Sequence, residues 1–153
     1  MRCAVLLMLC ACKAHEAPSQ AVAADEPIEP RPFPAKPTAQ PFTGTAAPAA
    51  TVITAAGWTV RTSDATLVAS APNDPRPRLL VADLAHPTPL IAGGSWACLT
   101  TLPGAQRIVH CVDPVRRLHI TSQPLPAAVT LAGIEPSRLV LHGPTGDLAL
   151  PLP

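Results

Sequence analysis

The stretch LIAGGSWACLTTLPGAQRIVHCV, residues 90–112, contains the clearest structural pattern in the chain. Two short apolar runs, WACLTT (96–101) and RIVHCV (107–112), flank the segment PGAQ (103–106). Adjacent proline and glycine between two strand-like runs are typical of a tight turn. The stretch therefore predicts a β-hairpin with its turn at PGAQ.

This hairpin places two cysteines opposite each other. With the turn centred on PGAQ, Cys98 faces Cys111, and the neighbouring pair is Leu99 with His110. Directly opposed residues of an antiparallel pair lie close enough for a disulfide, which we predict between Cys98 and Cys111. Two reduced, buried cysteines that pack as small apolar residues are the alternative.

The hairpin pattern occurs three times along the chain. ITAAG ends at Gly57, LIAGG at Gly94 and VTLAG at Gly133, and each is followed by a strand, a short turn and a second strand. Short strands separated by turn residues predict an all-β fold, either a small array of two to three propeller-blade-like hairpins or a β-sandwich. The third unit is cut short by the C-terminus. The predicted repeats lie near residues 51–88, 89–127 and 128–153.

The central unit resembles one repeat of the RCC1-type β-propeller family in its bacterial form. Gly93 and Gly94 match the family's paired glycines, and Cys98 and Cys111 match its two cysteines, whereas Trp96 stands where histidine is usual. The resemblance implies blade-like sheets that bury their faces against their neighbours. The family forms a closed ring of seven blades, for which this chain has no room, so an open array, a degenerate fragment or a sandwich that only mimics the repeat remain.

The N-terminus carries a different signal. Residues 3–11, CAVLLMLCA, are apolar, follow the single basic residue Arg2 and give way at once to Lys13. A transmembrane helix needs about 20 apolar residues, so this run is too short to span a membrane. A short apolar run after a basic start is typical of a signal peptide.

LCAC, residues 9–12, resembles the lipobox of bacterial lipoproteins, with Leu9 as the apolar residue, Ala11 as the small one and Cys12 as the lipidated cysteine. The resemblance implies that residues 1–11 are removed as a signal peptide and that lipid on Cys12 holds the protein to a membrane of the bacterial cell envelope. Lys13 after the cysteine favours the outer membrane. Ordinary secretion without lipid is the alternative.

Residues 12–50 form the predicted linker between anchor and domain. Between Lys13 and Ala50 there are 8 prolines and 11 alanines. Prolines exclude a helix and the segment has few apolar side chains to bury, so we predict a lipidated Cys12 followed by a disordered Pro/Ala-rich tether. The folded domain is then expected over residues 51–153.

The composition bounds the function. A formal net charge of +1 provides no basic patch for nucleic acid. His110 and Cys111 are adjacent and point to opposite faces of a strand, so we expect no metal site, and no motif indicates a cofactor or catalysis. Trp58 and Trp96 are candidates for binding a glycan or small molecule, although core positions suit them better.

The sequence as a whole predicts a lipid-anchored protein-interaction or structural module for an unidentified envelope protein. A small-molecule or glycan binder, or a non-functional remnant of a longer propeller protein, is the alternative.

Overall fold

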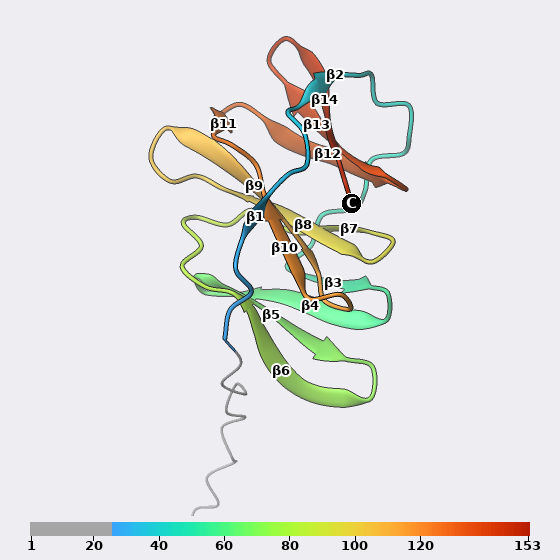
Figure 1. Ribbon diagram of the computed structural model, residues 1–153, viewed down its shortest axis with the longest axis vertical. Coiled ribbons are helices and arrows are strands. Elements are labelled where there is room, and N and C mark those ends of the chain that lie inside the picture. Colours follow the sequence, from blue (N-terminus) through green and yellow to red (C-terminus); the bar gives the residue numbers. More distant parts are fainter. Residues whose placement is uncertain (1–25) are drawn as a thin grey trace, which may run out of the picture.

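The computed structural model describes residues 26–153 and contains three small β-sheets (Figure 1). Sheet A is an antiparallel meander of four consecutive strands in which short turns join neighbours. Its first turn, Ala56–Gly57, has positive φ at both residues, the conformation that a two-residue hairpin requires. The strands of sheet A are β3 (Val52–Ala55), β4 (Trp58–Ser63), β5 (Thr66–Ala71) and β6 (Asp74–Val81).

Sheet B repeats this four-strand meander and adds two short strands, whereas sheet C repeats three strands of it and adds one. In sheet B a parallel strand lies beside β10 and a short strand pairs with β9. In sheet C, β2 from the N-terminal segment takes the fourth place, next to β14. Sheet B comprises β7 (Ile91–Gly93), β8 (Trp96–Thr101), β9 (Gln106–Asp113), β10 (Leu118–Thr121), β1 (Arg31–Pro32) and β11 (Leu125–Pro126); sheet C comprises β12 (Thr130–Glu135), β13 (Arg138–Gly143), β14 (Gly146–Pro151) and β2 (Thr38–Ala39).

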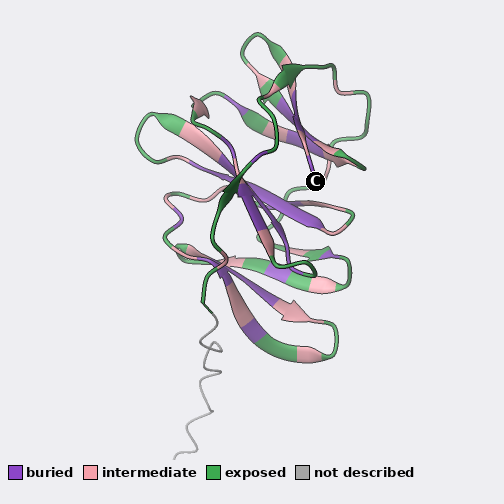
Figure 2. Ribbon diagram, in the orientation of Figure 1, coloured by how far each residue is buried: buried purple, intermediate pink, exposed green. Residues whose placement is uncertain are grey.

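The sheets stack in the order A, B, C, with one apolar core on each side of sheet B. Successive residues of a strand point to opposite faces, and in β8 Trp96 and Cys98 join the core shared with sheet C, whereas Ala97 and Leu99 join the core shared with sheet A. All six residues of β8 are buried, which Figure 2 shows as a continuous purple strand. Both faces of the central sheet are therefore covered, as the mixed apolar run WACLTT requires.

The predicted all-β array of hairpins is confirmed, and its three units coincide with the three sheets. Strand β8 has the predicted limits, and Cys98 faces Cys111 as the turn at PGAQ predicts. Strand β6 begins at Asp74 and runs through Pro75 and Pro77. These prolines fit because β6 is the outer strand of its sheet, where no neighbouring main chain needs their missing N–H groups.

The prediction of a disordered tether is wrong for residues 26–50. Residues 26–42, here called the strap, run along the outer edges of all three sheets, as the blue segment of Figure 1 shows. The Ile28 N–H donates to the Leu80 carbonyl of β6 at 2.8 Å, β1 pairs with β10, and β2 pairs with β14. The folded unit therefore begins well before residue 51.

Residues 43–50, the return segment, lead back along the opposite edges of the sheets, where β12, β7 and β3 lie. The Ala47 N–H donates to the Ala132 carbonyl of β12, and Ala50 forms a bridge with Leu90 before β7. The chain then enters β3, the edge strand of sheet A opposite β6. Within residues 26–50 the main chain thus bonds to all three sheets along one edge and then, on its return, to β12 and to Leu90 beside β7.

Three apolar side chains explain why so proline-rich a strap packs. Ile28 contacts the core between sheets A and B, Phe33 lies in the core between sheets B and C, and Phe42 covers Gly133 on the outer face of sheet C. Each proline also restricts the unfolded chain, which lowers the entropy lost on docking. The composition argument for disorder overlooked these three spaced anchors.

The described residues include no helix that is long and apolar enough to cross a membrane. The predicted signal peptide (1–11), lipidation site Cys12 and the first part of the tether, up to residue 25, lie outside the described residues.

The disulfide Cys98–Cys111 joins the two central strands of sheet B, with Cα atoms 4.2 Å apart and both residues fully buried. It closes a loop across a sequence separation of 13. Because closing a loop of this length removes conformational freedom from the unfolded chain, loss of the disulfide should lower the free energy of unfolding by about 2–3 kcal/mol.

Urea denaturation of wild type with and without reductant, and of a Cys98→Ala/Cys111→Ala double variant, measures this contribution. Reductant should leave the double variant unchanged. A wild type whose urea midpoint does not respond to full reduction would show that packing alone holds the hairpin.

Candidate functional site

A hollow of about 380 Å³ opens between sheets A and B beneath the start of the strap. Strap residues 27–30 form one wall, residues 81–83 at the end of β6 form a second, and β9 with β10 supply the floor. Proline, isoleucine, valine and alanine make up half of the lining residues. The polar half includes two histidines on the floor, His110 and His119, and the exposed Glu29 and Asp83.

The register of sheet B brings the two histidines together. His110 of β9 pairs with Leu99, and His119 of β10 pairs with Val112, so both rings lie on the face that looks toward sheet A. The rings stack with their centroids 5.4 Å apart and an interplanar angle of 20°. His119 is 3% exposed, which leaves its ring almost no contact with water.

A chain of hydrogen bonds runs from β8 through both rings to the strap. Thr101 Oγ1 lies 2.9 Å from His110 Nε2, His110 Nδ1 lies 3.1 Å from His119 Nε2, and His119 Nδ1 lies 3.2 Å from the Ile28 carbonyl oxygen. A carbonyl only accepts, so His119 Nδ1 carries a hydrogen and donates to Ile28. With both rings neutral, His110 Nδ1 must then donate to His119, and the Thr101 hydroxyl must donate to His110.

Both histidines are held in the neutral form. Burial, reinforced by the neighbouring His119, lowers the pKa of His110 to about 4. Burial also lowers the pKa of His119, although the hydrogen bond to the Ile28 carbonyl opposes that effect. Removal from water disfavours a charged imidazole, and a second charge beside it disfavours it further.

These shifts make stability depend on pH. A histidine in the unfolded chain has a pKa near 6.5, so on acidification the unfolded state takes up protons before the folded state does. The stabilising contribution of the neutral pair is complete above pH 6.5 and decreases as the pH falls toward about 4. We expect a loss of about 2 kcal/mol over this range.

Urea midpoints at several pH values between 7 and 4 check this expectation, with His110→Asn as the comparison. The variant should be less stable at pH 7 and should show a flatter profile. A wild-type profile that is already flat over this range would contradict it.

The two predicted binding tryptophans do not form an open platform. Trp96 is 4% exposed and the Arg116 guanidinium lies 5.4 Å from its ring centroid. Trp58 is partly buried against the core between sheets A and B, and Arg78 lies 5.7 Å from its ring centroid. Trp96 therefore occupies a core position, the one favoured for it, and the alternative of a glycan-binding surface does not apply to this residue.

Asp113 stabilises the turn between β9 and β10 through its hydrogen bonds. Its carboxylate is fully buried and accepts hydrogen bonds from Ser95 Oγ at 2.6 Å and from Arg116 Nε at 2.7 Å. Hydrogen bonds from Ser95 and Arg116 lower the pKa of Asp113 against the opposing effect of burial. Asp113 and His119, close in sequence, therefore belong to different clusters.

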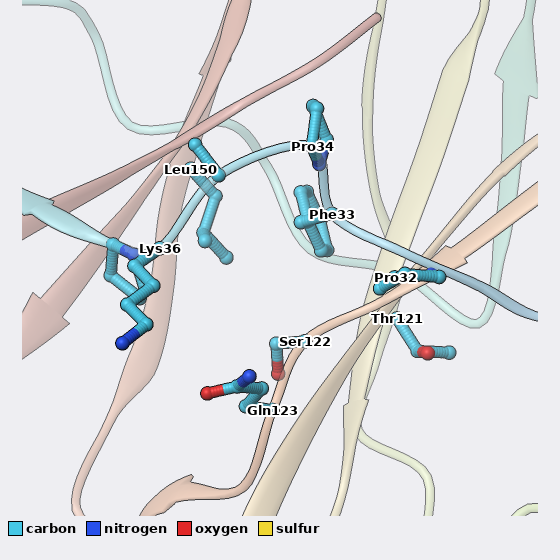
Figure 3. A pocket seen from close by; sticks show the side chains of 10 residues that line it. Pro32, Phe33, Pro34, Lys36, Thr121, Ser122, Gln123 and Leu150 are labelled. Atoms are coloured by element: carbon cyan, nitrogen blue, oxygen red, sulfur yellow. The ribbon is translucent and has the colours of Figure 1, made fainter.

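A second hollow, of about 200 Å³, lies further along the strap (Figure 3). Phe33 and Pro34 of the strap line it from one side, and Ser122 and Gln123, which follow β10, line it from the other. The strap thus runs alongside β10 between two hollows, with Thr121 and Ser122 lining both. Its contact with sheet B depends on a two-residue bridge and a few side chains.

Among residues 26–153, no three histidine, cysteine or acidic side chains come together as a possible metal site. No family model, curated protein or solved structure matches this chain.

The histidine pair was not among the predicted sites. The sequence contains a usable signal, because a turn at residues 114–117 places position 119 opposite position 112 and therefore on the same face as position 110. What the sequence does not show is the strap carbonyl above the rings, because Ile28 is 91 positions away from His119.

Proposed function

We propose that this protein is a lipid-anchored β-domain of the bacterial cell envelope that binds another envelope protein without catalysing a reaction. The lipobox-like LCAC at residues 9–12 supports the anchor. The disulfide Cys98–Cys111 suits an oxidising compartment outside the cytoplasm.

The observation that carries the proposal is the outer face of sheet A. Both faces of sheet B are buried, and Phe42 covers part of the outer face of sheet C. Within residues 26–153, by contrast, the outer face of sheet A remains exposed at neighbouring positions of β3 and β4, and Val52 is 53% exposed. The exposed residues are Val52, Thr54, Thr59 and Arg61.

This face has features of an interaction surface. A shallow hollow lies over it, and Arg61 is among the residues that line this hollow. In stacked-sheet proteins an end face is either capped or used for binding, because each unit buries its faces against neighbours. A partner that presents a β-surface with an acidic group near Arg61 would continue the stack.

The docked strap also sets how far the domain reaches from its anchor. Only 14 peptide units separate Cys12 from Glu26, where the described strap begins. At up to about 3.6 Å each, they span no more than roughly 50 Å. The proposed partner therefore lies near the membrane that holds Cys12.

Site-specific photo-crosslinking in intact cells tests the partner surface. A crosslinker at Thr59 should form a defined adduct, and a crosslinker at Val115, which is 54% exposed on the turn between β9 and β10, should not. Adding Arg61→Glu should abolish the Thr59 adduct. No adduct at Thr59, or equal adducts at both positions, would overturn the proposed surface.

The anchor has its own test. We expect the mature protein to begin at Cys12 and to carry acyl mass, since the lipobox resemblance places the cleavage after Ala11. Mass spectrometry of the native protein checks both points. A Cys12→Ser variant should be absent from the carbonate-washed membrane fraction. Its retention there would contradict lipidation but would not bear on the proposed partner surface of sheet A.

A further inference from the structure

We infer that the histidine pair is an acid-sensitive latch, which fastens the start of the strap to sheets A and B at neutral pH and releases it when both rings become protonated. The latch comprises Thr101, His110, His119 and the Ile28 carbonyl. The inference stands apart from the proposed partner surface, which lies on the other face of sheet A.

The hydrogen-bond chain accepts one proton but not two. If one ring is charged, the Thr101 hydroxyl can turn from donor to acceptor, and each remaining contact still joins a donor to an acceptor. If both rings are charged, every ring nitrogen carries a hydrogen. Two N–H groups then face each other across 3.1 Å with two positive charges behind them.

The charged groups around the pair do not relieve this conflict. Glu29 of the strap and Asp83 after β6 line the hollow, but both are exposed at its mouth, where water screens them. Arg117, in the turn before β10, donates to the Glu26 carbonyl and adds positive charge on the same side. Burial keeps the pKa of both histidines low, so the second proton arrives only in acid.

The part of the strap that would move is defined by its bonds. His119 and Leu80 hold Ile28 through its carbonyl and its N–H, and the next main-chain contacts are the bridge of β1 and the Phe33 N–H to the Thr121 carbonyl at 3.1 Å. Separation of the rings removes the support under Ile28. Release would free residues 26–33 and uncover the outer edge of β10.

The far end of the strap has an anchor that acid does not weaken in the same range. The Phe42 N–H donates to Asp147 Oδ2 at 2.8 Å, and hydrogen bonds from His142 and Phe42 keep the pKa of Asp147 below its usual value. The opening is therefore local, and the return segment should stay in place.

Residue-resolved amide exchange of the mature protein tests the latch. Between pH 7 and pH 4, the protection factor of the Ile28 amide should fall at least tenfold, whereas that of Leu99 in the central strand should change less than about threefold. Phe33 should follow Ile28, and Ala50 should follow Leu99. Unchanged Ile28 protection at pH 4, or a parallel loss at Leu99, would overturn the inference.

Two variants separate the latch from general acid sensitivity. His119→Asn keeps an N–H that can donate to the Ile28 carbonyl but cannot become charged, so Ile28 protection should no longer depend on pH over this range. His86→Asn removes an exposed histidine whose positive φ of 47° asparagine tolerates, and it should behave like wild type. An acid-induced loss of Ile28 protection that persists in His119→Asn would also overturn the inference.

Discussion

Phe33→Ala should lower the free energy of unfolding by about 3 kcal/mol or more, the usual cost of removing a buried aromatic ring. Phe33 is 8% exposed and belongs to the core between sheets B and C, although it comes from the proline-rich strap. The ring fills space above Ile120 and beside Leu150, so its loss leaves a cavity where three segments meet. Urea denaturation measures the change.

Two comparisons make this result interpretable. Phe33→Leu keeps most of the apolar volume and should cost less than about 1.5 kcal/mol. Val115→Ala, at a site that is 54% exposed, should stay within about 0.5 kcal/mol of wild type. If Phe33→Ala were as mild as Val115→Ala, the strap would not be part of the folded unit.

Gly93→Ala should be nearly as damaging, by about 3 kcal/mol, because the added methyl group has no room. A Cβ at Gly93 would lie 2.6 Å from Ile134 Cβ and 2.8 Å from Ile134 Cγ2. Gly93 is in β7 of sheet B and Ile134 is in β12 of sheet C, so the clash would push these two strands apart. The midpoint of urea denaturation reports this change.

Gly94→Ala is the matched control one residue away. Its added Cβ meets nothing within 4 Å, but its φ of +60° disfavours alanine, so the cost should be about 1 kcal/mol. Ile134→Ala should not rescue Gly93→Ala, since the Cβ that causes the closest contact remains. Wild-type stability of Gly93→Ala would show that the two strands separate at little cost.

The features that the sequence predicted best are those that depend on residues close together in the chain. Strand β8 and the facing pair Cys98–Cys111 follow from an apolar run, a turn and a count of positions, all within 23 residues. The three hairpin units could be predicted for the same reason. The unbroken apolar run at 96–99 also explains why both faces of β8 are buried once a neighbouring sheet exists on each side.

The packing of the strap and the burial of the histidine pair beneath it could not be predicted in this way, because both depend on contacts between distant parts of the chain. Composition favoured disorder for residues 26–50, whereas Ile28, Phe33 and Phe42 each find a site that another sheet provides. The buried environment of His119 depends equally on Ile28. Local pattern gives no information on whether such a receiving site exists.

The path of the strap has a consequence for the order in which the protein folds. The Phe42 amide and the Asp147 carboxylate that binds it are 105 positions apart, and β2 completes its sheet only beside β14, which is synthesised long after it. Contacts with long sequence separation form slowly, because a large loop must close before they contribute. During synthesis or export, the hairpins of sheets A and B can form as they emerge, while the first part of the described chain waits for the last. Closure of sheet C is therefore expected to be the final and slowest step of folding.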